Sequence, residues 1–231
     1  MVGFVDPYLD PATGILRNRV GARTRAELDR AEGDLSFAAM IQPLTRPPRP
    51  TGDLTELRAI HRGLFADVYD WAGEIRTVDI RKDADGAEFF LPVSMIDRAA
   101  SFTAEELRSD GMLRGLDRRR FVQRLAHHYD QLNYIHPFRE GNGRAQRLFW
   151  DRVARDAGWE LDWRRVSGAE NDRASRIASE TRDLRPLCTM LERAVIPAAP
   201  RPRPRATTAA AARDRSRLGG RAPRRDADRG R

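Results

Sequence analysis

Apolar residues recur at intervals of three and four along most of residues 24–195, which is the spacing of amphipathic helices. Capping residues and breakers divide this pattern into seven segments. Helices are predicted to begin near Thr24, Asp53, Ser94, Asp117, Gly141, Ser167 and Leu184. Three ends are marked: Pro43 for the first helix, Gly73 for the second and Gly158 for the fifth. The chain is therefore predicted to be mostly α-helical.

One segment between the predicted helices, residues 75–92, has a different pattern. Ile75, Val78 and Ile80 predict a short extended piece, residues 83–86 are rich in turn formers, and residues 88–92 predict a second extended piece. Two interpretations fit this pattern: a small β-hairpin, or an ordinary loop anchored by its apolar residues. The residues by themselves slightly favour the loop.

Composition separates the end of the chain from the rest. From Pro197 onward, prolines and arginines alternate and large apolar residues become rare, so a disordered tail is predicted. Eleven Arg and three Asp in this tail account for the whole net charge of +8. A solvated tail is the favoured interpretation, and weak contact with nucleic acid or an acidic partner is the alternative. The predicted organisation is a helical extension over residues 1–50, a core domain over 51–196 and a tail over 197–231.

Features of an exported or membrane protein are missing from the sequence. The N-terminus lacks a basic stretch followed by an apolar one, so no secretory signal is expected. No apolar run reaches the length that crosses a bilayer. Cys188 is the only cysteine, which excludes an intrachain disulfide, and its apolar surroundings predict burial. A cytoplasmic location is expected.

The stretch His-Pro-Phe-Arg-Glu-Gly-Asn-Gly-Arg-Ala-Gln-Arg, residues 136–147, concentrates groups that handle phosphate. Gly141, Asn142 and Gly143 stand where a loop becomes a helix, and the unpaired N–H groups of a helix's first turn attract anions. Arg144 and Arg147 follow one turn apart on the same face. Because guanidinium groups grip phosphate oxygens, this pair can hold two successive phosphates.

Two further residues of this stretch suit transfer chemistry. Glu140 precedes the turn, and Mg²⁺ is commonly held by one carboxylate together with phosphate oxygens and water. His136 is a candidate base, because the unperturbed pKa of a histidine side chain, about 6.5, suits proton removal near neutral pH. Phe138 alternates with polar residues and is predicted to be a buried peg that fixes the loop.

A structural explanation exists for each of these residues taken singly. A histidine, an acid and two arginines on a helical hairpin can form a salt-bridge cluster, and Gly-Asn-Gly is a common turn. His61, beside the apolar face of the second helix, is predicted to be a packed or capping residue, because no second ligand lies at metal spacing. The joint order of residues 136–147 favours chemistry.

That order resembles the signature of the Fic family, H-x-F-x-[DE]-G-N-G-R-x-x-R, at every fixed position. Residues 67–76 resemble the family's helix-ending segment, residues 90–92 resemble its flap hairpin, and residues 133–135 lead into the motif as expected. The resemblance covers roughly residues 1–195. It implies a mostly α-helical Fic fold, a helical bundle with a central motif helix and a small β-hairpin flap, and so favours the hairpin at residues 75–92.

The resemblance also implies transfer of AMP from ATP to a hydroxyl side chain of a target protein. His136 would take the proton from the attacking hydroxyl, and Glu140 would hold Mg²⁺ against the phosphates. The turn of Gly141, Asn142 and Gly143 would cradle the phosphates, while Arg144 and Arg147 would bind the outer ones. Four flap residues would pair with a target segment by β-augmentation: Glu88, Phe89, Phe90 and Leu91.

Fic enzymes are commonly restrained by a glutamate in an [ST]-x-x-x-E-[GN] helix that pairs with the second motif arginine, here Arg147. Glu32 is followed by Gly33, but Leu28 stands where Ser or Thr is required, so Glu32 is expected to be a solvated helix residue. Glu170 fails in the same way. The resemblance therefore implies a toxin whose inhibitory glutamate comes from a separate small antitoxin. Its target would present a Tyr, Thr or Ser hydroxyl, as a DNA topoisomerase subunit does for related toxins.

Two other functions remain open besides AMP transfer. Some relatives transfer a different phosphate-containing group, and the Doc-type branch is a kinase, but its motif lacks the second glycine that Gly143 supplies here. A catalytically silent binding module is the third hypothesis, and the intact His136 disfavours it.

Overall fold

The computed structural model describes residues 6–41, 48–81 and 90–199. Residues Met1–Ala198 form one compact unit, and the second unit begins at Ala199. The described part contains seven α-helices: α1 (Arg25–Ile41), α2 (Leu54–Phe65), α3 (Ile96–Ser109), α4 (Arg118–Ile135), α5 (Asn142–Asp156), α6 (Gly168–Thr181) and α7 (Arg185–Ala194). The predicted mostly α-helical fold is confirmed.

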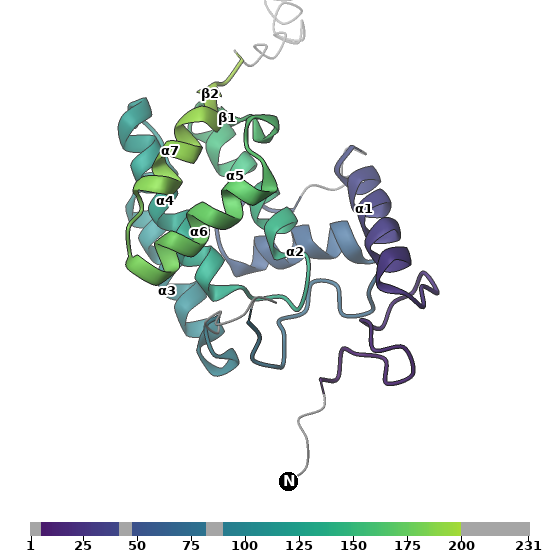
Figure 1. Ribbon diagram of the computed structural model, residues 1–231. Coiled ribbons are helices and arrows are strands. Elements are labelled where there is room, and N and C mark those ends of the chain that lie inside the picture. Colours follow the sequence, from purple (N-terminus) through teal and green to yellow (C-terminus); the bar gives the residue numbers. More distant parts are fainter. Residues whose placement is uncertain (1–5, 42–47, 82–89, 200–231) are drawn as a thin grey trace, which may run out of the picture. The chain divides into compact units, whose positions relative to one another are not determined.

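Helix α5, which carries the second half of the motif, lies in the middle of the bundle (Figure 1). It packs against α2 and α4, while α4 also contacts α3, α6 and α7. Helix α1 stands at one side and packs mainly on α2 (Figure 1). A cluster of buried apolar residues holds these helices together and includes Phe121, Leu125, Phe149, Val153 and Leu187. The motif helix is thus fixed on several sides.

The sequence analysis did not predict the small sheet. Strand β1 (Trp159–Leu161) pairs antiparallel with β2 (Val195–Pro197), with Glu160 opposite Ile196. Each strand has three residues, which is too short for an alternating pattern to show. The sheet joins the chain after α5 to the chain after α7.

Local capping signals place most helix starts. Thr24 and Glu27 form the expected capping box, since each side chain accepts from the other's backbone N–H, at 3.3 and 3.1 Å. Asp53, Asp117 and Ser167 cap α2, α4 and α6. Ser94 does not cap α3, which begins at Ile96 after a turn of 3₁₀-helix.

Helix α2 ends at Phe65, not near Gly73 as predicted. The residues after it form turns, and Val68, Tyr69 and Ala72 point back into the core. Because these apolar residues continue the helical spacing, the sequence pattern extends past the helix itself. Gly73 takes a φ of 82°, which ends the turn region.

Part of the predicted flap lies outside the described residues, including Glu88 and Phe89. At its base, the N–H of Phe90 donates to the carbonyl of Ile80 at 3.0 Å, so the two sides of the segment meet. Within the described ranges, no helix is long and apolar enough to span a bilayer.

Candidate active site

His136 is held at the end of α4 in an unusual backbone conformation. Its φ of 45° and ψ of 62° are left-handed, and its N–H donates to the carbonyl of Leu132 at 3.2 Å. A non-glycine residue adopts this region at some cost, so the surroundings must impose it. The ring Nδ1 lies 3.1 Å from the carbonyl oxygen of Asn133. Because a carbonyl only accepts, Nδ1 carries the proton of the neutral ring, and Nε2 carries the lone pair that a base needs.

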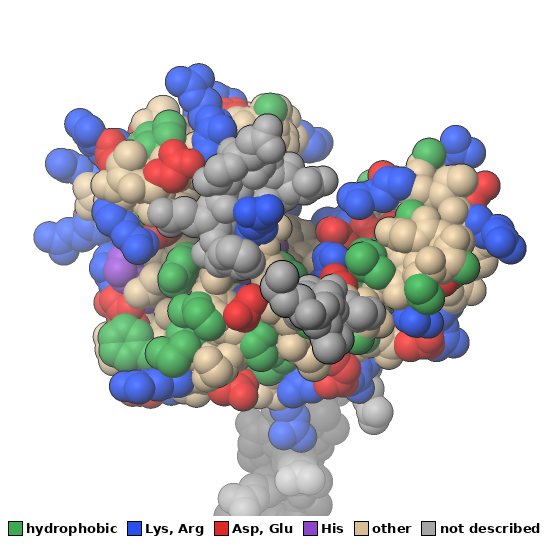
Figure 2. All heavy atoms as spheres, turned by 60° about the horizontal axis from the view of Figure 1, so that its bottom comes forward, with side chains coloured by type: hydrophobic (Ala, Val, Ile, Leu, Met, Phe, Trp, Pro, Cys, Tyr) green, Lys and Arg blue, Asp and Glu red, His purple; other side chains and the backbone are tan. Residues whose placement is uncertain are grey.

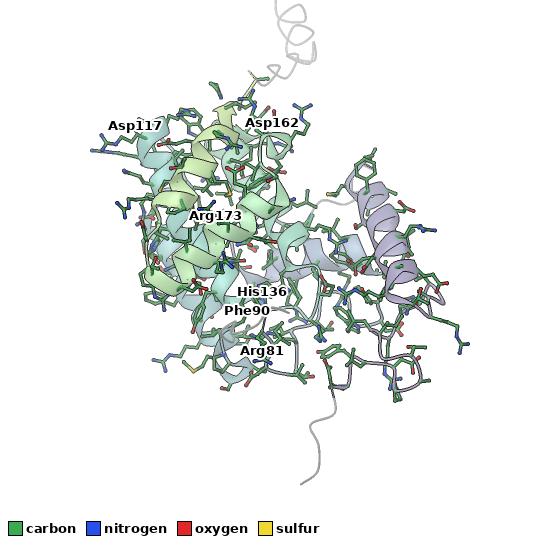
Figure 3. All side chains as sticks on the ribbon, in the orientation of Figure 1. Arg81, Phe90, Asp117, His136, Asp162 and Arg173 are labelled. Atoms are coloured by element: carbon green, nitrogen blue, oxygen red, sulfur yellow. The ribbon has the colours of Figure 1, made fainter. Side chains whose placement is uncertain are left out.

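Two of the predicted flap residues contact the end of α4. The ring of Phe90 stacks on the ring of His136, with centroids 3.7 Å apart and planes 12° apart (Figure 3). The N–H of Leu91 donates to the carbonyl of Tyr134 at 3.1 Å. The base of the flap therefore lies directly against the candidate base His136.

The loop between His136 and α5 is closed by Asn142. Its side-chain oxygen accepts from the N–H of Phe138 at 2.9 Å, and its side-chain nitrogen donates to the carbonyl of Phe138 at 2.8 Å. Phe138 itself is fully buried, as predicted. The side chain of Asn142 is thus committed to the loop, and only its backbone N–H can serve an anion.

The two motif glycines differ in backbone conformation and in the space around them. Gly141 has a φ of 79°, and a Cβ there would lie 2.4 Å from the ring of Phe65. Gly143 is exposed and helical, and a Cβ there would meet nothing within 4 Å. Gly141 is required by the fold, whereas the space over Gly143 is open. Helix α5 starts here without a side-chain cap, so the N–H groups of its first turn can face a ligand.

His61 supports the same loop and is not a metal ligand. It is fully buried, and its ring stacks on Phe138 with centroids 3.9 Å apart. The N–H of Gly73 donates to Nδ1 at 2.8 Å, so Nε2 carries the proton and donates to the carbonyl of Glu140 at 2.9 Å. Burial lowers the pKa of His61 to about 4. The predicted packed histidine is confirmed, and it joins α2 to the motif.

The buried His61 should make stability depend on pH. Its pKa is about 4 when folded and about 6.5 when unfolded, so between these values the unfolded chain binds more protons. We expect the free energy of unfolding to reach its highest value above about pH 6.5 and to fall by up to about 3 kcal/mol as the pH drops toward 4. Urea unfolding across this range measures it. In His61→Gln, which keeps both hydrogen bonds but does not titrate, the fall should be smaller; an equal fall would contradict this assignment.

Glu140 lies beside the open start of α5. Its carboxylate is 37% exposed, accepts from the N–H of Gly141 at 2.9 Å, and lies 3.9 Å from Arg144. Mg²⁺ favours sites with one or two carboxylates and completes its shell with phosphate oxygens and water. A single accessible carboxylate next to an anion-binding helix start fits that ion.

Glu32 is not solvated, and this expectation was wrong. Its residue is only 7% exposed, its carboxylate pairs with the guanidinium of Arg144, and it accepts a hydrogen bond from the hydroxyl of Tyr69. Arg144 also donates to the hydroxyl of Ser36 at 3.1 Å and lies over the ring of Phe65. The packing of α1 on α2 brings Glu32 to the motif, and this tertiary contact is not visible in the sequence.

Arg147 has different surroundings from Arg144. Its guanidinium carbon lies 5.5 Å above the ring of Trp163, and the described part of the chain shows no ion pair to it. The two motif arginines are therefore not equivalent.

In Figure 2 the surface is hollowed between the part that carries α1, at the right, and the rest of the unit, and acidic and basic side chains line the hollow.

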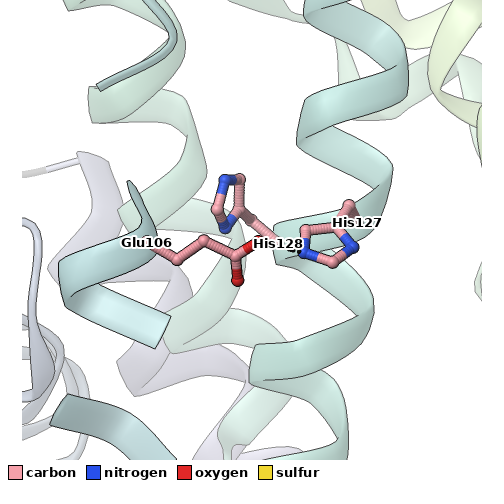
Figure 4. Close-up of side chains that lie close together, drawn as sticks. All are labelled: Glu106, His127 and His128. Carbon is pink, nitrogen blue, oxygen red and sulfur yellow. Dashed lines mark hydrogen bonds and ion pairs between the residues drawn. The ribbon is translucent and has the colours of Figure 1, made fainter. Parts of the chain in front are cut away.

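A second group of polar side chains lies between α3 and α4 (Figure 4). The Nε2 atom of His127 lies 2.8 Å from Glu106, and that of His128 lies 2.8 Å from Asp110. Arg124 contacts both carboxylates, at 3.2 and 2.5 Å. Since the guanidinium supplies the positive charge that a metal would bring, we interpret the group as an ion-pair network that joins the two helices.

Sequence reasoning missed two arginines that position the motif. Arg139 pairs with Asp6 at 2.9 Å, which ties the N-terminal segment to the motif loop. Arg76 is buried and donates to the backbone carbonyl of His136 at 2.9 Å. The only signal for Arg76 was its place at the end of residues 67–76, which resembled a family segment without indicating a role.

The fold and this site define a helical protein in which an uncapped helix start follows the loop that carries the candidate base His136. A family model described as "Fic/DOC family" matches residues 51–154. The chain is 40% identical over 173 residues to Protein adenylyltransferase VbhT of Bartonella schoenbuchensis, covering 75% of this chain and 36% of VbhT. It is 39% identical to a protein of Escherichia coli K12 named as a probable protein adenylyltransferase Fic, covering 70% of this chain and 78% of that protein. The chain belongs to the Fic/DOC family.

Solved structures agree with the fold. BepC, a VirB-translocated effector protein from Bartonella tribocorum with bound AMPPNP, has a TM-score of 0.77 at 24% identity, covering 83% of this chain and 97% of that one. The N-terminal Fic domain of a Bep effector protein from Bartonella quintana with bound ADP has a TM-score of 0.76 at 25% identity, covering 82% and 94%. The chain spans only about a third of the length of VbhT, so the activity of that whole protein is not carried over here.

Proposed function

We propose that this protein is a protein adenylyltransferase that transfers AMP from ATP to a hydroxyl side chain of a target protein. The observation that supports it best is the uncapped start of α5, open above Gly143, with the carboxylate of Glu140 on the N–H of Gly141 and His136 in the loop that leads into the helix. An anion site next to a base and a carboxylate suits transfer of a phosphate-containing group. The names of the two relatives favour AMP as that group.

In this mechanism Nε2 of His136 takes the proton of the target hydroxyl. The hydroxyl oxygen attacks the α-phosphorus of ATP, a new P–O bond forms, and the bond to the bridging oxygen of the β-phosphate breaks. Diphosphate leaves with that electron pair. The protein contributes position and charge, because the oxygens that become negative lie against N–H groups fixed in advance.

The outer phosphates are proposed to bind Arg147. Its guanidinium lies over the ring of Trp163, and the described part of the chain shows no ion pair to it, so a phosphate would not have to break one. Arg144 was expected to share this role, but it reaches a nucleotide only by giving up part of its contact with Glu32 and Ser36. We therefore assign Arg144 mainly to holding α1 against the motif.

Mg²⁺ is proposed as the cofactor, held by the carboxylate of Glu140. When bound, it supplies positive charge that neutralises the phosphate oxygens during transfer.

The flap residues Glu88, Phe89, Phe90 and Leu91 are proposed to pair with an extended segment of the target, which presents its Tyr, Thr or Ser hydroxyl to His136. Because ATP is the donor, we place the reaction in the cytoplasm, where a DNA topoisomerase subunit is a candidate target.

A regulator that supplies a carboxylate to Arg147 is part of this proposal. Among the described residues, Glu32 forms an ion pair with Arg144, whereas no ion pair to Arg147 is present. A small antitoxin with an inhibitory glutamate would supply a carboxylate to Arg147. Expression of the chain with and without neighbouring reading frames tests it: toxicity relieved by one neighbour supports the pair, and equal toxicity in every combination counts against it.

The activity is tested with two labels. The protein is incubated with cell lysate, Mg²⁺ and ATP labelled at either the α- or the γ-phosphate. Label from the α-phosphate alone is expected on a lysate protein. Label from the γ-phosphate alone would show a kinase, and no label from either would favour a binding module.

Gly143 provides a test of the nucleotide site that leaves the fold alone. We expect Gly143→Val to weaken binding of AMPPNP with Mg²⁺ at least about tenfold, because the branched side chain enters the space where a phosphate approaches the backbone. The free energy of unfolding should change by less than about 1 kcal/mol, since nothing lies within reach of the new Cβ. Calorimetric titration measures the affinity. Unchanged affinity in a folded variant would place the phosphates elsewhere.

A further inference from the structure

Arg76 is a cation buried beside the candidate base. Its side chain is 0% exposed. The nearest carboxylate among the described residues is that of Asp79, at 3.6 Å, and its own side chain is 55% exposed. Desolvation lowers the pKa of Arg76. A buried charge with so little direct compensation needs another source of negative potential.

Backbone carbonyls supply that potential. The guanidinium donates to the carbonyl of His136 at 2.9 Å, to that of Val78 at 2.8 Å, to that of Ile135 at 3.4 Å and to that of Leu91. Ile135 ends α4, and the last carbonyls of a helix have no partner within it and carry partial negative charge. Arg76 thus caps the C-terminal end of α4, where His136 has its left-handed backbone conformation.

The same guanidinium holds the base of the flap. Leu91 is one of the four predicted target-docking residues; Arg76 donates to its carbonyl, and its N–H donates to the carbonyl of Tyr134 on α4. Asp79, beside Arg76, accepts from the N–H of Val93 at 2.8 Å. One planar group therefore fixes both the backbone of His136 and the described end of the flap segment at Leu91.

We propose that Arg76 is a positioning residue that couples the flap to His136, so that a target segment and the base are brought into register. This inference rests on the proposed transfer to a target bound at the flap. Bonds to three separate segments need the forked geometry of a guanidinium, with nitrogens that point in different directions. A lysine ammonium is a single point and cannot reach the carbonyls of His136, Val78 and Leu91 together.

The test compares Arg76→Lys with Arg58→Lys, a matched control. Arg58 donates to the carbonyl of Gly73 at 2.8 Å and to Glu74, in the same region, but does not contact His136 or the flap. We expect Arg76→Lys to lower kcat for α-label transfer to the lysate target at least about tenfold, with the KM for ATP and the affinity for AMPPNP within about twofold of wild type. Arg58→Lys should change none of these values.

A second readout separates positioning from general stability. Histidine ring NMR signals of His136 should shift in Arg76→Lys and stay in place in Arg58→Lys, at a temperature where circular dichroism shows both to be folded. Equal kcat in the two variants, or loss of AMPPNP affinity in proportion to kcat, would overturn the proposal. If Arg76→Lys does not fold, Asp79→Ala replaces it, with a smaller loss of kcat expected and no loss contradicting the coupling. Absence of α-label in the wild type would refute the proposed function, while the NMR comparison would still test the contact.

Discussion

His136→Asn is expected to abolish AMP transfer while leaving the fold and the nucleotide site intact. General base catalysis contributes about 10²–10⁴-fold to rate, so α-label on the target should fall by at least two orders of magnitude. Asn is the right replacement because it tolerates the left-handed conformation seen at φ 45° better than most residues. Loss of activity then reports loss of the base and not backbone strain.

The nucleotide contacts proposed here lie on α5 and not on His136. Calorimetric titration with AMPPNP and Mg²⁺ should therefore give an affinity for His136→Asn within about threefold of wild type, and the melting temperature should change little. A variant that keeps more than about a tenth of the wild-type transfer rate would show that another group takes the proton.

Gly141→Ala is expected to cost about 3 kcal/mol of stability, the largest structural effect of a single methyl group in the motif. The new Cβ would lie 2.4 Å from Cε2 of Phe65, a ring that is fully buried and cannot move aside. Overpacking of this kind costs about 1–3 kcal/mol, and a non-glycine residue at φ 79° adds about 1 kcal/mol more. Urea unfolding measures the difference.

Gly143→Ala is the matched control for that measurement, because it adds the same methyl group two residues later, into open space and in a helical conformation. Its free energy of unfolding should stay within about 1 kcal/mol of wild type. The double variant Phe65→Leu with Gly141→Ala should recover part of the loss, since a smaller side chain makes room. A loss for Gly141→Ala no larger than that for Gly143→Ala would mean that the contact with Phe65 does not constrain the motif.

Much of the fold could be predicted because helix starts are local. Thr24, Asp53, Asp117 and Ser167 each cap a helix with their own side chains within three residues. The end of α2 was missed because the residues after Phe65 stay buried and continue the apolar spacing without staying helical. The short strands after α5 and α7 pair with each other across the fold, so neither has a signal of its own.

The site was predictable only where its residues are consecutive. Residues 136–147 show their order in the sequence, but the contacts that join Glu32 and Arg76 to the motif link residues more than fifty positions apart. A pattern rule excluded Glu32 because Leu28 stands in the place of a hydroxyl residue, yet packing of α1 brings its carboxylate to Arg144. Arg76 has no local mark of burial, because its main partners are backbone carbonyls that every residue carries.

The central claim is that AMP, and not phosphate, is moved to a hydroxyl with His136 as the base. It is tested most directly by the mass of the group attached to the labelled target, measured on its peptides by mass spectrometry after reaction with wild type and with His136→Asn. We expect one AMP group on a single Tyr, Thr or Ser hydroxyl, present with wild type and absent with the variant. A phosphate at that residue, or an AMP group that persists with His136→Asn, would contradict it.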